Sequence, residues 1–351
     1  MLADRIEEKW IDAFVQLFSL SKVAPGDEVA ILSETQSRTI NLHLAELALL
    51  RMGATPFHLQ IPSPKQTAPV PVRSTGASQA IRGNKSILAA LTSVPVVVDC
   101  TVEGLMHAPE LPQILQSGAR VLNISDEHPE ALARLLPTEA LKAQTLAASR
   151  KIRQASTMQV TSAAGTDLTV NLEKAPAVGI WGFTDKPGTL SHWPGGIIVS
   201  FPNKDSVNGT LVIDMGDINL TFKRYVTDPL QLTIENDFVS NIEGHGTDYE
   251  LFTRYLAAWD DPLAYATSHV GWGLNPAARY EALSMYDKND TNGTEIRAYA
   301  GNFLFSTGAN EFAGRFTEGH FDIPIRGCTI TLDGEAVVED GHLVQSSHSM
   351  P

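Results

Sequence analysis

The chain has 351 residues, of which 43% are hydrophobic and 19% are charged, and its formal net charge is -14 at pH 7. This length exceeds what a single core usually fills, so the composition indicates a globular protein of two packed domains. The strong negative charge repels phosphate backbones and anionic membrane surfaces. We therefore expect no nucleic acid and no membrane among its partners.

The cysteine count limits both the kind of site and the compartment. Cys100 and Cys328 are the only cysteines, which excludes a disulfide framework and a four-cysteine zinc or iron–sulfur site. Residues 1–20 carry charges within their apolar pattern, and no apolar run elsewhere approaches the roughly 20 residues that cross a bilayer. A cytoplasmic location, which is reducing, fits these features best.

The first 155 residues alternate between two periodicities. An opening helix is predicted by apolar residues at spacings of three and four, namely Ile6, Trp10, Phe14, Leu17 and Phe18. Strands are then predicted at 28–33, 55–60, 94–99 and 119–124, and helices at 39–52 and 138–154. This alternation predicts a Rossmann-like α/β domain over residues 1–155 with a mainly parallel sheet. The first strand lacks a Gly-x-Gly-x-x-Gly motif, so no dinucleotide site is expected.

A proline-rich stretch interrupts this alternation. Residues 61–72 contain Pro62, Pro64, Pro69 and Pro71, which prevent regular structure, so we predict a loop or arm. An arm of this kind can reach a neighbouring subunit, and a homo-oligomer is expected.

From about residue 156 short alternating segments dominate. Hairpins are predicted for 159–162 with 168–172 and for 230–234 with 239–242, and a helix for 249–259. The dipeptides Asn208-Gly209 and Asp333-Gly334 are typical of tight turns. Residues 156–351 are therefore predicted to form a mixed α+β domain.

Three residues in this second part are candidate metal ligands. His320 and Asp322 are two apart in a predicted strand, so both side chains lie on one face. His269 lies in a segment rich in glycine and small residues, where the backbone can approach a ligand closely. Two histidines and one carboxylate form the facial triad of non-haem iron(II) oxygenases. The simpler alternative is that His320 and Asp322 are an ordinary exposed or hydrogen-bonded pair and that His269 is a core histidine bonded to a carbonyl group.

Four further residues are candidates for the surrounding pocket. His107 follows the strand ending at Asp99, in a place where parallel sheets form ligand crevices, and a neutral imidazole can act as a base. His192 has aromatic, proline and glycine neighbours that suggest a pocket wall. Arg297 and Ser306 can bind an anionic oxygen and a polar ring substituent, although arginine often serves a structural ion pair.

Several segments together resemble one family. They are HWP (192–194), SHVGWGL (268–274), GNFLFSTG (301–308) and HFDIP (320–324), with weaker similarity at 106–110 and 136–139. They resemble the bacterial 2,5-dihydroxypyridine 5,6-dioxygenases of nicotinate degradation, and the resemblance covers most of residues 156–335.

This resemblance implies an Fe(II) site on His269, His320 and Asp322. It also implies catalytic roles for His107 and His192, and substrate binding by Arg297 and Ser306. The expected reaction is extradiol-like cleavage of a hydroxylated pyridine ring by dioxygen, with both oxygen atoms entering an N-formylmaleamate-type product. The family pattern carries a carboxylate where residues 178–182 of this chain are apolar or glycine. A related hydroxylated N-heteroaromatic substrate therefore stays open.

Two other classes of function compete with this hypothesis. A two-metal aminopeptidase-like hydrolase is distantly similar to the same family, and it would need bridging carboxylates such as Glu243 or Glu295. A binding module with purely structural histidines is the non-enzymatic alternative. Metal analysis separates the three, because they predict one iron ion, two metal ions and none.

Overall fold

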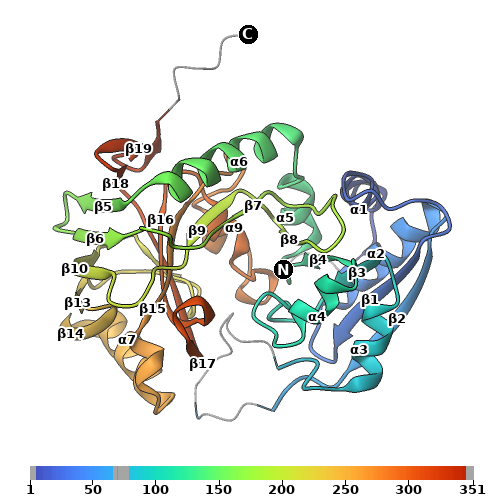
Figure 1. Ribbon diagram of the computed structural model, residues 1–351, viewed down its shortest axis with the longest axis horizontal. Helices are drawn as coiled ribbons and strands as arrows, with labels where there is room; N and C mark the ends of the chain where they lie inside the picture. The colour runs from blue at the N-terminus through green and yellow to red at the C-terminus, as the bar shows by residue number, and fades with distance from the viewer. Residues whose placement is uncertain (1–4, 66–68, 70–78, 345–351) are drawn as a thin grey trace, which may run out of the picture.

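The structure is a computed structural model that describes residues 5–65, 69 and 79–344. A parallel sheet with its helices occupies one side of the molecule, and the two main antiparallel sheets occupy the other (Figure 1). The predicted fold class, an α/β part followed by a mixed α+β part, is confirmed.

The parallel sheet has the strand order β2-β1-β3-β4-β8. Its strands are β1 (Glu28–Glu34), β2 (Thr55–Ile61), β3 (Val96–Asp99), β4 (Arg120–Ile124) and β8 (Leu190–Trp193). Successive residues of β1 and β3 enter different cores: Ile31 and Val98 belong to one, Ala30 and Val97 to the other. A strand buried on both faces needs a continuous apolar run, as these segments have.

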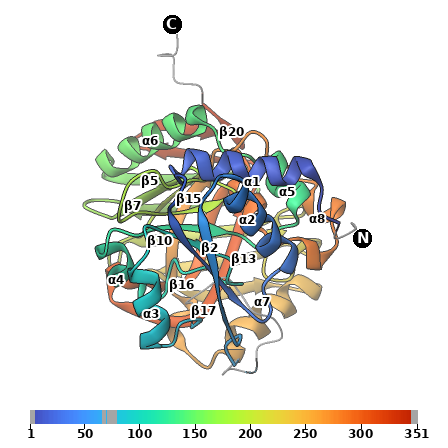
Figure 2. The same cartoon turned by 90° about the vertical axis from the view of Figure 1, so that its right-hand side faces the viewer.

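Helices cover both faces of this sheet. They are α1 (Glu8–Leu20), α2 (Thr39–Arg51), α3 (Lys85–Thr92), α4 (Leu111–Gln116) and α5 (Pro129–Arg134). Helices α1, α2 and α5 pack on one face, and α3 and α4 pack on the other (Figure 2). The predicted stripe on α1 is confirmed for Trp10, Phe14, Leu17 and Phe18, which are buried, whereas Ile6 precedes the helix and is exposed.

The division predicted after residue 155 stays a prediction, and two elements pack across it. Helix α6 (Glu139–Gln154) packs against β7 (Ala177–Ile180), and its Leu141 and Ile152 lie in the core of the antiparallel sheets. In the opposite direction, β8 pairs with β4 and completes the parallel sheet. Strand β8 was not predicted, because its four residues are too few to show a period.

The larger antiparallel sheet has the order β14-β13-β10-β6-β5-β18-β19-β20. Its strands are β5 (Thr157–Ser162), β6 (Asp167–Asn171), β10 (Val207–Ile213), β13 (Leu230–Glu235), β14 (Phe238–Gly244), β18 (Cys328–Leu332), β19 (Glu335–Glu339) and β20 (His342–Leu343). Asp333 and Gly334 join β18 to β19 with φ values of 48° and 86°, which confirms this predicted turn.

The turn predicted at Asn208-Gly209 is wrong, because both residues lie inside β10. Gly209 pairs with Ile234 on one side and Leu168 on the other. A Cβ atom at Gly209 would lie 2.2 Å from the carbonyl oxygen of Asp167. The glycine therefore serves close backbone approach within the sheet rather than a turn.

The smaller antiparallel sheet has the order β17-β16-β15-β9-β7 and lies between the other two sheets (Figure 1). Its remaining strands are β9 (Ile197–Ser200), β15 (Thr267–Gly273), β16 (Phe303–Asn310) and β17 (Arg315–Ile325). One face sends Trp272, Phe305 and Phe321 into the core that it shares with the larger sheet. The alternate residues therefore face the parallel sheet.

Short elements complete the chain: α7 (Gly246–Ala258), α8 (Ala282–Met285), α9 (Thr294–Ala298), β11 (Ile218–Asn219), β12 (Arg224–Tyr225), and the 3-10 turns η1 (Pro262–Tyr265), η2 (Lys288–Asp290) and η3 (Glu311–Ala313). Helix α7 confirms the helix predicted near 249–259. In the predicted loop 61–72, residues 62–65 have no regular structure, and residues 66–68 and 70–72 lie outside the described residues. No described helix combines the length and apolar character that a membrane crossing requires.

Candidate metal centre

Strand register brings the three predicted ligands together. His269 on β15 pairs with Ser306 on β16, and Ser306 pairs with Asp322 on β17. His320 lies two residues before Asp322 and therefore on the same face of the strand. One ligand atom from each of His269, His320 and Asp322 lies within 4.8 Å of the others, and all three residues are buried.

Asp322 is the centre of this cluster. Its Oδ1 lies 3.0 Å from Nε2 of His320 and 3.8 Å from Nε2 of His269. The Ser306 hydroxyl donates to the same oxygen, and Nε of Arg297 donates to Oδ2 at 2.5 Å. The carboxylate is thus oriented from both sides.

The charge state of the cluster suits a cation. Burial opposes ionisation of Asp322, but Arg297 and His320 outweigh it and hold the pKa of the carboxyl well below its usual range. Burial lowers the pKa of His269 to about 3, so its ring is neutral at pH 7. Nδ1 of His269 is buried and makes no hydrogen bond to a described residue, whereas its Nε2 faces Oδ1 of Asp322. Two imidazoles and one carboxylate fit a divalent transition metal such as iron(II).

A cavity opens beside the cluster, at the carboxyl ends of the parallel strands. His269, His320 and Asp322 form part of its wall, and the residues after β3, the end of β4 and β8 form the opposite part. Its apolar lining comprises Val102, Met106, Ile180, Leu190, Ile197, Val199, Phe201 and Leu304. An apolar cavity with a few polar groups, placed where open α/β sheets bind ligands, is suited to a small molecule.

The structure brings His107 into this cavity, as predicted from its place after β3. Its Nδ1 lies 3.1 Å from Oε1 of Glu311, and its ring centroid lies 6.3 Å from that of His320. A carboxylate can only accept, so Nδ1 carries the proton when the ring is neutral. Nε2 is then the nitrogen that can accept a proton.

His192 lines the same cavity from β8. Its Nδ1 lies 2.7 Å from the carbonyl oxygen of Pro194, so this nitrogen donates and Nε2 can accept. Burial lowers the pKa of His192 to about 4. The ring is therefore a neutral hydrogen-bonding group at pH 7.

Arg297 and Ser306 have different positions. Arg297 extends from α9 and lines the cavity while it pairs with Asp322. Ser306 is fully buried beside Asp322 and is not among the residues that line the cavity. The substrate-binding role predicted for both stays a prediction, and in this structure both orient Asp322.

Two residues of the site were missed from sequence. Glu311 lies on η3, distant in sequence from His107, and no local motif joins the two. Phe201 follows β9, and its ring centroid is 5.7 Å from that of His269. Phe201 directly follows an apolar run, so its sequence context is that of an ordinary core residue.

The carboxylates considered for a two-metal site lie elsewhere. Glu243 is exposed on β14 and accepts a hydrogen bond from Asn241. Glu295 is buried and pairs with Arg134, with a distance of 2.7 Å between Nη1 and Oε1. Neither belongs to the cluster of His269, His320 and Asp322.

The fold and the site together define a protein with a buried histidine–carboxylate cluster beside a small-molecule cavity. The family model for 2,5-dihydroxypyridine 5,6-dioxygenase matches residues 9–345. A 2,5-dihydroxypyridine 5,6-dioxygenase of Pseudomonas putida KT2440 is 39% identical over 340 residues, which is 96% of each chain. This chain belongs to the 2,5-dihydroxypyridine 5,6-dioxygenase family.

Two solved structures are similar to this fold. The structure of 2,5-dihydroxypyridine dioxygenase from Pseudomonas putida KT2440 matches with a TM-score of 0.92 and 38% identity over 100% of both chains. Wild-type AmpT from Thermus thermophilus matches with a TM-score of 0.64 and 16% identity over 96% of this chain and 100% of its own. The second likeness concerns the fold alone.

Proposed function

We propose that this chain is an iron(II)-dependent dioxygenase that opens the ring of 2,5-dihydroxypyridine or a close hydroxylated N-heteroaromatic. The observation that carries the proposal is the convergence of the buried residues His269, His320 and Asp322 on the wall of one cavity. Family membership supports the substrate class. The expected product is of the N-formylmaleamate type, with both atoms of one dioxygen molecule incorporated.

His269, His320 and Asp322 would hold the iron. A ferrous ion at such a triad supplies the one-electron chemistry through which dioxygen reacts with an electron-rich aromatic ring. Ser306 and Arg297 fix the orientation of Asp322, which sets the geometry of the donor group.

Proton transfer in this proposal belongs to His107. With Nδ1 bonded to Glu311, its Nε2 takes the proton of a substrate hydroxyl, and the Glu311 carboxylate stabilises the resulting imidazolium. His192 offers a second, neutral acceptor to a hydroxyl or ring N–H. The guanidinium of Arg297 adds a positive charge beside the ionised substrate oxygen.

Isotope labelling tests the reaction itself. The iron(II)-loaded protein is expected to consume one dioxygen per 2,5-dihydroxypyridine and to place both atoms of labelled dioxygen in the product, measured by mass spectrometry. The triad variant His320→Ala, treated identically, is the control for uncatalysed oxidation. Label from water instead of dioxygen would contradict the proposal and favour a hydrolase.

The apolar stretch 178–182 gives a prediction about specificity. Within it Ile180 is buried, pairs with Ile197 and lines the cavity. The resemblance to the family implies a carboxylate in this stretch, and a carboxylate can accept a hydrogen bond from a substrate hydroxyl or N–H. Ile180→Glu is therefore expected to raise kcat/KM for 2,5-dihydroxypyridine. Ile180→Gln and Ile180→Met control for polarity and size, and a gain shared by Ile180→Met would show that a carboxylate is not the cause.

We propose further that the chain acts in the cytoplasm as a homo-oligomer. Cys100 and Cys328 are free and buried, which suits a reducing compartment. Light scattering on the purified protein measures the oligomeric state, and a monomeric mass would overturn that part of the proposal.

A further inference from the structure

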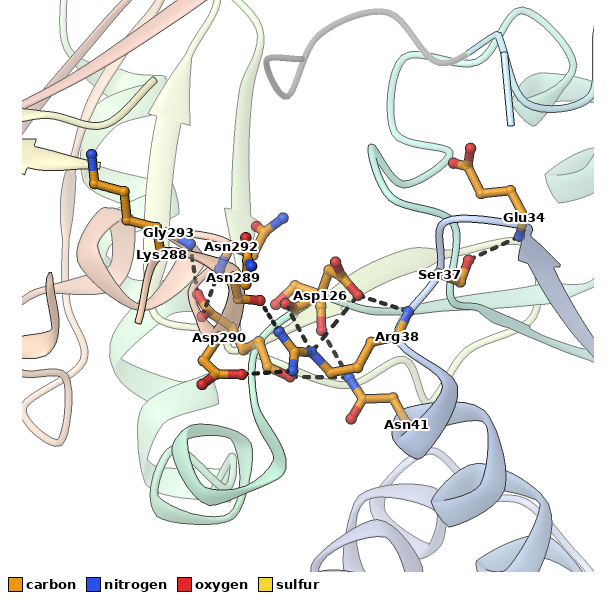
Figure 3. A network of polar contacts seen from close by, with 12 residues as sticks. Glu34, Ser37, Arg38, Asn41, Asp126, Lys288, Asn289, Asp290, Asn292 and Gly293 are labelled. Atoms are coloured by element: carbon orange, nitrogen blue, oxygen red, sulfur yellow. Dashed lines mark hydrogen bonds and ion pairs between the residues drawn. The ribbon is translucent and has the colours of Figure 1, made fainter. Parts of the chain in front are cut away.

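One wall of the cavity is fixed by hydrogen bonds to the parallel half of the molecule, and not by the antiparallel sheet that carries His269, His320 and Asp322. This wall consists of residues 287–293 and α9, and Asn292, Thr294 and Arg297 line the cavity from it. Segments after β4 and before α2, in the parallel half of the molecule, contact it through a dense polar network (Figure 3).

Arg38 binds the part of this wall around residues 289 and 290. In Figure 3 its guanidinium lies between Asp126 and Asp290. Nη1 of Arg38 donates to Asp290 at 3.1 Å, Nη2 donates to the carbonyl oxygen of Asn289, and the backbone N–H of Arg38 donates to Asp126 at 3.0 Å. The backbone N–H of His128 donates to the carbonyl oxygen of Asp290 at 3.0 Å. The chain around residue 290 is thus fixed to α2 and to the segment after β4.

Glu127 binds the same wall at the start of α9. Its carboxylate accepts the backbone N–H groups of Asn292 and Gly293, both at 2.8 Å, and of Glu295 at 3.2 Å. Glu127 is 1% exposed. A buried carboxylate that accepts several N–H groups makes strong, directional bonds, so it determines where this short helix begins.

The far end of α9 reaches the candidate metal centre. Arg297, two residues after Glu295, donates to Asp322. On the adjacent side of the helix, Glu295 pairs with Arg134 of α5. The path from Glu127 to Asp322 therefore runs from the bound N–H groups at the start of α9 along the helix to the guanidinium of Arg297.

We propose that Glu127, assisted by Arg38, is a positioning residue of the centre: it sets α9 so that Arg297 meets Asp322 and the wall of the cavity is complete. The inference rests on the proposed function for Asp322 as a metal ligand and for the role of Arg297 toward substrate. It explains why a carboxylate is buried outside the cluster, where it contacts neither the candidate ligands nor the cavity. On this proposal the position of Asp322, on the antiparallel sheet, depends on Glu127 and Arg38 in the parallel half of the molecule.

A double-mutant cycle tests this inference. Glu127→Gln, Arg297→Gln and the double variant are compared for Co(II) affinity by absorption titration, and for kcat/KM with iron(II) and 2,5-dihydroxypyridine. Glu127→Gln alone is expected to weaken Co(II) binding and lower kcat/KM by about 10-fold each. In the Arg297→Gln background the same change is expected to have less than about a 2-fold effect, because its route to Asp322 is already lost.

The matched control is Asp248→Asn. Asp248 is also a fully buried carboxylate, and it accepts backbone N–H groups from Thr227 at 2.8 Å and Asp228 at 3.2 Å, but neither of these residues lines the cavity. It is expected to lower the thermal midpoint without changing Co(II) affinity. Equal losses from Glu127→Gln in both backgrounds, or an equal loss of affinity in Asp248→Asn, would overturn the inference.

Two provisions keep this test decisive. If Glu127→Gln does not fold, Arg38→Gln removes a contact nearer the surface, and unchanged Co(II) affinity in the folded Arg38→Gln protein overturns the inference. If wild-type protein binds Co(II) but does not oxidise dihydroxypyridine, the proposed function fails, whereas the Co(II) cycle still decides the role of Glu127.

Discussion

Replacing any one of the three candidate ligands with alanine is expected to abolish iron binding and turnover while the protein stays folded. Each variant leaves two protein donors in place of three, which lowers the affinity for a divalent ion and leaves more of its coordination positions to water. Iron content by anaerobic metal analysis and dioxygen uptake with 2,5-dihydroxypyridine measure the two effects. Full iron occupancy in a variant would remove that residue from the ligand set.

The structure also predicts which of these variants loses the most folding stability and which loses the least. Asp322→Ala removes the carboxylate that pairs with Arg297, and breaking a buried ion pair costs about 3–5 kcal/mol. His269→Ala is expected to cost the least, because Nδ1 of His269 makes no hydrogen bond to a described residue. Thermal unfolding of the metal-free variants measures this order. His43→Ala, an exposed histidine on α2, is the control and should retain iron, activity and stability.

His107→Ala is expected to retain iron yet lower turnover by about two to four orders of magnitude, the usual contribution of a general base. His107 lies on the cavity wall without being part of the ligand cluster, so the ion should not depend on it. Steady-state kinetics on iron-replete protein measure the loss. Loss of iron, or unchanged turnover, would contradict the assignment.

Substitution of Glu311 distinguishes between a catalytic and a purely structural role of His107. Glu311→Gln retains a group that can accept from Nδ1 but removes the charge that stabilises the imidazolium. It is expected to lower kcat by a smaller factor than His107→Ala and to have little further effect in the His107→Ala background. Added imidazole should partly restore the activity of His107→Ala, because the truncation leaves room for it. A glutamate effect that persists without His107 would mean that Glu311 acts by another route.

The local sequence was sufficient where a pattern repeats within one element. The alternation of buried strands and helices predicted the parallel sheet, and the stripe on α1 identified its buried face. His320 and Asp322 were predicted to share a face because side chains alternate along any strand. The Asp333-Gly334 turn followed from residues that accept positive φ.

Contacts between distant residues were decided only by tertiary structure. Asn208-Gly209 was predicted to be a turn, but its glycine is required by the neighbouring strand. Strand β8 joins the parallel sheet through partners 69 positions earlier in the chain, so no local period reveals it. The bonds from Glu311 to His107 and from Glu127 to the start of α9 likewise depend on packing, because hydrogen bonds form between atoms that the fold brings within about 3 Å. Sequence alone therefore named His269, His320 and Asp322 as candidate ligands, and the register of β15, β16 and β17 decided that they lie together.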